Sequence, residues 1–188
     1  MKQKYDEKIQ RQLDKPQTWF VKYFPVRIGN VNFEQRIARQ VVYDFKDGKS
    51  YELVARETAK YMKKTYGKDC KSIVFSCVPA SSTEKNEIRY KAFSARVCEL
   101  SGAINGFEHV KVIGERLTIH DHRNAEKEVR KSSVIEFDND FFKEKKVVVF
   151  DDVITKGLSY ANYANQIEEL GGNVLGGVFL ARTHYKAN

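Results

Sequence analysis

Apolar residues in this chain occur both as short continuous runs and at helical spacing. The runs at 73–75, 147–150 and 174–180 predict strands covered on both faces, and those at 110–113 and 134–137 predict further strands. Helical spacing marks three segments that end near glycines, at 51–66, 87–101 and 160–170. Strands alternating with helices of this length predict a doubly wound α/β fold with a mostly parallel sheet flanked by helices.

The segment between residues 39 and 50 is expected to be a strand and a turn. Val41, Val42, Tyr43 and Phe45 favour the strand, and Asp47-Gly48 the turn. Ser50 is expected to cap the helix that follows. That helix and the next are predicted to bury two apolar faces, Val54, Ala55, Thr58, Ala59 and Met62 in the first and Phe93, Val97 and Leu100 in the second.

Length and composition exclude several classes of protein. A chain of 188 residues suits one domain, and 41% hydrophobic with 12% aromatic residues excludes a disordered chain. The apolar runs fall far short of the roughly 18 residues that cross a bilayer. The first fifteen residues are charged and do not resemble a secretory signal. We therefore expect a single cytoplasmic domain over 1–188, with 1–38 as an arm or hood of unknown role and no membrane partner.

A formal net charge of +8 attracts polyanions, which include nucleic acid and small phosphorylated ligands. The basic residues are spread along the chain, and short clusters such as Lys63-Lys64 and 143–146 favour a solvated face over a dedicated nucleic-acid patch. Near the amino terminus, basic residues alternate with Trp19, Phe20, Tyr23 and Phe24. Such aromatics more often anchor a terminal arm than stack bases, but both interpretations stay open.

Cysteines and histidines offer little chemistry. The three cysteines lie far apart without a C-x-x-C pair, which favours reduced core thiols (Cys70, Cys77, Cys98). His120-Asp121-His122 could share a metal ion, but a third ligand at suitable spacing is missing, so an exposed polar loop is favoured. His109 and His184 flank strands and are expected to be satisfied neighbours rather than ligands.

The most informative segment is the apolar strand 147–150 with the residues that follow it. Asp151 and Asp152 place two carboxylates at its carboxyl end, where open α/β sheets bind ligands. The loop to the next helix contains Thr155, Gly157 and Ser159. Unpaired N–H groups at a helix start, with hydroxyls beside them, can hold a phosphate. Carboxylates repel phosphate, so their expected partners are sugar hydroxyls or a divalent cation.

This segment resembles the motif that binds phosphoribosyl pyrophosphate (PRPP) in the type I phosphoribosyltransferases. The resemblance implies a PRPP site formed by Asp151, Asp152, Val153, Ile154, Thr155, Lys156, Gly157, Leu158 and Ser159. The two aspartates would hold the ribose hydroxyls, and residues 155–159 the 5-phosphate. Lys156 and Leu158 depart from the family pattern, which often has threonine and a small residue there.

The likeness extends over about 39–183 but is weaker outside this motif. The stretch after the strand at 73–78 is similar to the family's pyrophosphate loop, which implies that role for Pro79, Ala80, Ser81 and Ser82. The segment 115–124, Phe137 and the ending 180–183 are similar to the ComF-like branch. In the 6-oxopurine enzymes of the family an acidic residue stands at the position of Thr155, so its absence argues against hypoxanthine or guanine as acceptor.

The resemblance implies transfer of ribose 5-phosphate from PRPP to a nitrogen acceptor, with Mg²⁺ on the departing pyrophosphate. Mg²⁺ would be coordinated mainly by PRPP itself, and Asp151 and Asp152 could provide further ligands. Charge separation in the transition state calls for cations near the leaving group. Arg89, Arg116 and Arg123 are the catalytic candidates beside the two aspartates, with Lys91 as a further basic candidate. The polar segment 114–131 stands where the family has a loop that closes over the site.

Other functions remain open at this point. The chain could be a PRPP-binding regulator or a DNA-associated ComF-like factor that lacks turnover, or an effector that consumes PRPP or a nucleotide. The acceptor is unknown, and nucleic acid or a second copy of the chain stays open as a partner. Nucleic-acid binding would depend steeply on salt, because each phosphate contact releases counterions.

Overall fold

The computed structural model describes residues 5–120 and 128–186, with backbone only for 115–120 and 128–133. Its main sheet has five strands in the order β1-β7-β6-β2-β3. Every neighbouring pair is parallel, which confirms the predicted parallel α/β sheet. In that order the strands are Gln17–Tyr23, Asn173–Thr183, Lys146–Ile154, Ile73–Cys77 and Ile104–Asn105.

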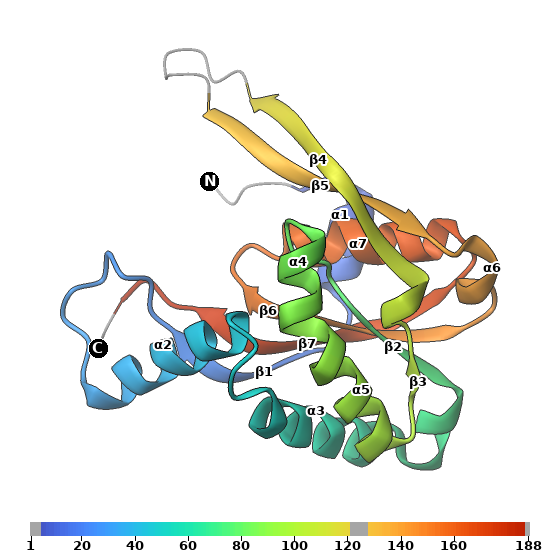
Figure 1. The fold of residues 1–188 in the computed structure, drawn as a ribbon, viewed down its shortest axis with the longest axis horizontal. Helices are drawn as coiled ribbons and strands as arrows, with labels where there is room; N and C mark the ends of the chain where they lie inside the picture. Colours follow the sequence, from blue (N-terminus) through green and yellow to red (C-terminus); the bar gives the residue numbers. More distant parts are fainter. Residues whose placement is uncertain (1–4, 121–127, 187–188) are drawn as a thin grey trace.

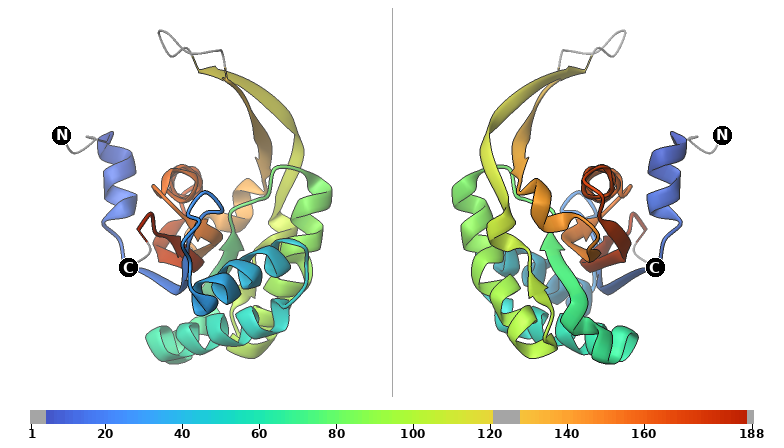
Figure 2. Two further views of the ribbon diagram at one scale, coloured as in Figure 1. Left: turned by 90° about the vertical axis from the view of Figure 1, so that its left-hand side faces the viewer. Right: turned by 90° about the vertical axis from the view of Figure 1, so that its right-hand side faces the viewer.

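Helices cover both faces of this sheet, so the fold is doubly wound (Figures 1 and 2). α7 (Leu158–Glu169) packs on one face over Val147 and Val149. α2 (Phe33–Lys46), α3 (Tyr51–Tyr66) and α5 (Ala92–Ser101) pack on the other, over Phe75 and Phe150. Alternate residues of β6 thus enter two separate cores, as a strand covered on both faces requires.

The strands predicted at 110–113 and 134–137 do not join the main sheet. They belong to β4 (Val110–His120) and β5 (Glu128–Phe137), which pair antiparallel from Val110 opposite Phe137 to His120 opposite Glu128. Figure 1 shows this hairpin as an arm that leaves the body of the molecule. The predicted loop segment 114–131 therefore lies mostly in the hairpin. Short connections follow the arm, including α6 (Asn139–Phe142).

The strand predicted at 39–45 is wrong, because these residues belong to α2. The helix begins at a capping box, in which the Asn32 side chain accepts from the Gln35 N–H and the Gln35 side chain accepts from the Asn32 N–H. Val42 and Phe45 are fully buried, and their separation of three residues suits a helical face rather than a strand. Ser50 does precede α3, but in a left-handed conformation and without a side-chain cap.

The helix predicted from Glu87 begins earlier than expected. Ser82 accepts the Lys85 N–H and caps α4 (Thr83–Asn86), a π-helical turn follows at Glu87–Lys91, and α5 then continues to Gly102. Leu100 is only half-buried, while Cys98 is buried instead. Phe93 and Val97 are buried as predicted.

The expectations for the helix at 51–66 and for the cysteines were met. α3 buries the predicted face and ends at Gly67, which has positive φ. A 3₁₀ turn follows at Gly67–Ser72, and another at Phe107–His109 precedes β4. All three cysteines are buried and free. Within the described part of the chain, no helix is long and apolar enough to cross a membrane.

The amino-terminal segment is built into the domain. β1 pairs with β7 along one side of the sheet, from Gln17 opposite Gly177 to Tyr23 opposite Thr183. Phe24 is buried, whereas Trp19 is exposed and lies under the Arg182 guanidinium. The aromatics therefore anchor this segment, and β1 is an edge strand.

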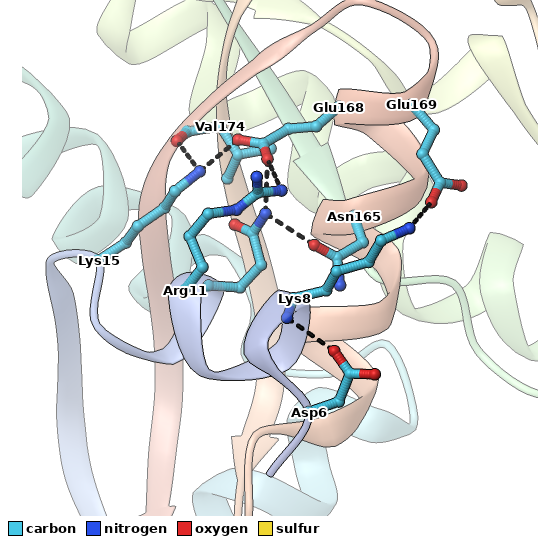
Figure 3. A network of polar contacts seen from close by, with 9 residues as sticks. Asp6, Lys8, Arg11, Lys15, Asn165, Glu168, Glu169 and Val174 are labelled. Atoms are coloured by element: carbon cyan, nitrogen blue, oxygen red, sulfur yellow. Dashed lines mark hydrogen bonds and ion pairs between the residues drawn. The ribbon is translucent and has the colours of Figure 1, made fainter.

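α1 (Glu7–Leu13) docks on α7 through a polar network shown in Figure 3. Glu168 is its centre, because its carboxylate accepts from Arg11 at 2.8 Å, from Gln12 at 2.7 Å and from Lys15. Gln12 also donates to Asn165 at 2.9 Å. Burial favours the neutral form of Glu168, but the hydrogen bonds from Lys15 and Gln12 prevail and lower its pKa.

Glu168→Gln should lower the free energy of unfolding by about 1 to 2 kcal/mol near neutral pH, since it weakens charge-assisted hydrogen bonds. A lowered folded-state pKa contributes stability that is present above the unfolded pKa and is lost as pH falls through the folded one, so the difference between wild type and variant should shrink as pH falls below about 4. Urea unfolding at neutral pH and at successively lower pH measures it. Glu169→Gln is the matched control, because the Lys8–Glu169 pair is exposed. Equal losses in the two variants would refute this role for Glu168.

Candidate functional site

The acidic pair lies at the carboxyl end of β6, still within the ladder to β7. Asp151 is opposite Phe179, and Val153 is opposite Ala181. The Asp151 carboxylate accepts the Asp152 N–H at 2.8 Å. Asp151 is half-buried and Asp152 is buried. The two carboxylates are thus fixed by the strand rather than by a flexible loop.

Two cations lie beside the Asp152 carboxylate. Arg89 donates to its carboxylate at 2.6 Å from the π-helical turn, and the Lys46 ammonium on α2 lies 3.8 Å away. Arg89 Nε is buried and has no hydrogen-bond partner among the described residues. Burial, and then the negative charge of Asp152, raise the pKa of Asp151 well above its usual range. Asp152 is therefore already paired, whereas within the described residues the Asp151 carboxylate accepts only the neighbouring Asp152 N–H and forms no ion pair.

The loop after β6 turns sharply into α7. Gly157 has φ +76°, which favours glycine, and a Cβ there would lie 2.5 Å from Leu13 Cδ2. Thr155 and Ser159 are exposed, and the Thr155 hydroxyl lies 2.7 Å from that of Thr183. The loop borders a hollow of about 450 Å³, called the loop cavity, whose lining comprises Asp151 and residues 153–160. This cavity therefore brings together a glycine turn, two exposed hydroxyls and the start of α7.

Two further hollows continue from the loop cavity, each sharing residues with the one before it. The central cavity, of about 570 Å³, shares Val153 and Thr155 with the loop cavity and is lined by Tyr23, Pro25, Arg27, Lys46, Asp152, Val153, Thr155, Thr183 and Tyr185. The lysine cavity, of about 640 Å³, shares Lys46 with the central cavity and is lined by Tyr43, Lys46, Asp47, Lys85, Ile88 and Arg89. The acidic pair thus stands between a hydroxyl-lined loop and a group of three cations.

The stretch predicted as a pyrophosphate loop faces another hollow. Pro79 and Ser81 line the largest cavity, of about 720 Å³, beside α1, α7 and Ser159. This cavity contains neither aspartate, so its size does not identify it as the chemical centre. The Ala80 N–H donates to the buried Asn86 side chain at 3.0 Å, and Ser82 caps α4. The Ala80 N–H and the Ser82 hydroxyl therefore already form hydrogen bonds within this part of the chain.

The other basic candidates are placed differently from Arg89. Arg116 lies on β4 opposite Ser132, and Arg123 lies outside the described residues. Lys91 pairs with Glu87 at 3.9 Å on the surface. Among the described side chains of these four basic candidates, only that of Arg89 contacts the acidic pair.

The two described histidines that flank strands differ in their contacts. His109 lies 2.9 Å from Asp138 and stacks on Phe141. His184 packs beside Phe24, but its buried Nε2 has no hydrogen-bond partner among the described residues, so the expectation of a satisfied side chain is wrong for His184. Of the motif at 120–122, the last two residues lie outside the described chain. Among the described residues, no group of three His, Cys, Asp or Glu side chains could hold a metal ion.

The sequence interpretation missed several lining residues. Lys46 lies just beyond residues wrongly predicted as a strand, and Lys85 belongs to a helix start that was placed too late. Tyr23, Arg27 and Tyr185 lie far from the motif in sequence. The capping box at Asn32 was the signal that could have identified α2 and hence the position of Lys46.

Comparison with known proteins gave limited results. No protein-family model and no curated protein matches the chain. Among solved structures it is similar to adenine phosphoribosyltransferase from Rhodothermus marinus, with TM-score 0.42, 17% identity, and coverage of 68% of this chain and 66% of that one. It is also similar to purine phosphoribosyltransferase from Pyrococcus horikoshii, with TM-score 0.37, 11% identity, and coverage of 69% and 85%. The chain thus spans just under two thirds of the adenine enzyme.

The two aspartates should respond oppositely to neutralisation. Asp151→Asn should stabilise the protein progressively as pH rises above about 4, because a raised folded-state pKa makes the charged carboxylate costly. Asp152→Asn should lower the free energy of unfolding by about 3 kcal/mol, because it leaves Arg89 buried without its counter-charge. Urea unfolding between pH ~4 and ~8 measures both. Destabilisation by Asp151→Asn at the upper end of this range would contradict the assignment.

Proposed function

We propose that the protein binds PRPP and transfers its ribose 5-phosphate to a nitrogen acceptor, releasing pyrophosphate. The observation that carries the proposal is the junction of β6 and α7. There Asp151, the exposed Thr155 and Ser159 hydroxyls and the tight Gly157 turn line one cavity, and Asp152 lines the adjoining central cavity. A ribose 5-phosphate carries both a phosphate, which suits the loop, and a pair of hydroxyls, which suits the carboxylates.

In this proposal the 5-phosphate binds in the loop cavity. The N–H groups at the start of α7 and the hydroxyls of Thr155 and Ser159 donate to it. Asp151, whose carboxylate is not engaged by a cation in the way that Asp152 is, accepts from the ribose hydroxyls. Burial raises the pKa of Asp151 because the charged carboxylate lacks hydrogen bonds, and the hydroxyls of a bound diol would supply hydrogen bonds to that charged form.

The leaving group is placed toward the lysine cavity. The lone pair of the acceptor nitrogen forms the new bond to C1 of the ribose as the C1–O bond breaks and its electron pair leaves with pyrophosphate. The proton of an N–H acceptor leaves with the pyrophosphate. Lys46, Lys85 and Arg89 stabilise the negative charge that develops, since preorganised cations in a partly buried site strengthen this effect.

Mg²⁺ fits this site as an ion carried largely by the ligand. With Asp152 paired to Arg89, Asp151 is the carboxylate open to it, and the described residues form no three-ligand group. Mg²⁺ commonly binds through one or two carboxylates plus phosphates and water. When bound, it would neutralise charge on the pyrophosphate.

A second candidate is a PRPP-binding regulator, or a DNA-associated factor of the ComF-like kind, without turnover. The observation that favours it is the Asp152–Arg89 pair, which occupies one of the two carboxylates that the motif offers to the sugar. PRPP binding without pyrophosphate release in any acceptor mixture would favour this candidate.

Calorimetric titration of PRPP with Mg²⁺ into the folded protein tests the proposal. Wild type should bind, and Asp151→Asn should weaken binding at least about tenfold, because charged hydrogen bonds contribute about 1.5 to 3 kcal/mol. Asp69→Asn, which removes an exposed carboxylate in the turn before β2, is the matched control and should bind normally. Absence of binding to folded wild type, or equal binding by Asp151→Asn, would refute the proposed site.

A further inference from the structure

The central cavity has walls that the motif does not supply. One wall is the segment after β1, with Tyr23, Pro25 and Arg27, and another follows β7, with Thr183 and Tyr185. The His184 N–H donates to the Tyr23 carbonyl at 2.8 Å and ties these walls together. The amino-terminal segment, for which the sequence indicates no role, thus forms part of a cavity beside the acidic pair.

The charges facing this cavity favour an anion. Arg27 and Lys46 are its cations, and Asp152 is its only anion in the described lining. Asp152 is held more closely by Arg89, at 2.6 Å, than by Lys46, at 3.8 Å. Positive charge therefore remains available to a ligand in the cavity.

The aromatic residues of the walls favour a planar ligand. The Arg27 guanidinium lies 5.1 Å above the Tyr185 ring, and this ring is half-exposed. The Tyr23 hydroxyl is 3.5 Å from that of Tyr43, and burial followed by this hydrogen bond raises the pKa of Tyr23 to about 12. Tyr23 therefore stays a neutral hydroxyl at neutral pH and does not repel an anion.

We infer that the acceptor is a planar nitrogen heterocycle carrying a carboxylate, bound in the central cavity with that carboxylate toward Arg27. Guanidinium groups pair with carboxylates and stack on aromatic faces, which suits both parts of such a ligand. The cavity shares Val153 and Thr155 with the loop cavity, so a ring there lies beside the sugar. The inference rests on the proposed function and specifies its acceptor class.

Matched pairs of compounds test the acceptor class. A pyridine carboxylate and a pyrimidine carboxylate, each beside its carboxamide, are titrated calorimetrically into protein saturated with PRPP and Mg²⁺, and pyrophosphate release is followed in parallel. At least one acid should bind at least about tenfold more tightly than its amide, since the amide cannot form the charged pair. Binding of neither acid, or equal binding of acid and amide, overturns the inference.

Arg27→Gln should weaken binding of the preferred acid at least about tenfold while leaving PRPP affinity unchanged. Arg36→Gln is the matched control, because Arg36 is exposed on α2 and lines none of these cavities. Equal effects of the two variants overturn the assignment of Arg27. If wild type fails to bind PRPP, the proposed function fails first; if PRPP binds but the acids do not, only the acceptor class fails.

Discussion

Two adjacent carboxylates at the end of a buried strand are the constraint on which the rest of this site depends. A strand covered on both faces cannot hold two uncompensated charges, so other elements must supply counter-charges. Lys46 on α2 and Arg89 on the π-helical turn do so for Asp152. Asp151 forms no ion pair with the described residues, and burial together with the charge of Asp152 raises its pKa. The strand therefore creates one satisfied and one available carboxylate.

The segments outside the motif give this centre its surroundings. α1 is tied to α7 through Glu168, and Leu13 closes against Gly157 behind the loop. β1 and the end of β7 supply the walls of the central cavity, with Arg27 stacked on Tyr185. The phosphate loop, the acidic pair and the cations are thus positioned by packing from both ends of the chain.

Much of the fold could be predicted because its signals are local. The apolar run of β6, the spacing of α7 and the glycines after α3 and α5 each occur within about a dozen residues. α2 was missed because Val41, Val42 and Tyr43 favour strands, while the Asn32 capping box and the burial of Val42 and Phe45 decide for a helix. Strand partners could not be predicted, since β4 and β5 pair with each other rather than with the sheet. The cations at Asp152 depend on tertiary packing, so only Arg89 was anticipated.

The most direct test of this account is a crystal structure of the protein with PRPP and Mg²⁺. The account predicts the 5-phosphate within hydrogen-bonding distance of the loop at Gly157 and Ser159, with the ribose hydroxyls on Asp151 and the pyrophosphate toward Arg89 and Lys85. A ligand bound instead in the largest cavity, against Ser81 and Asn162 and away from both aspartates, would contradict it.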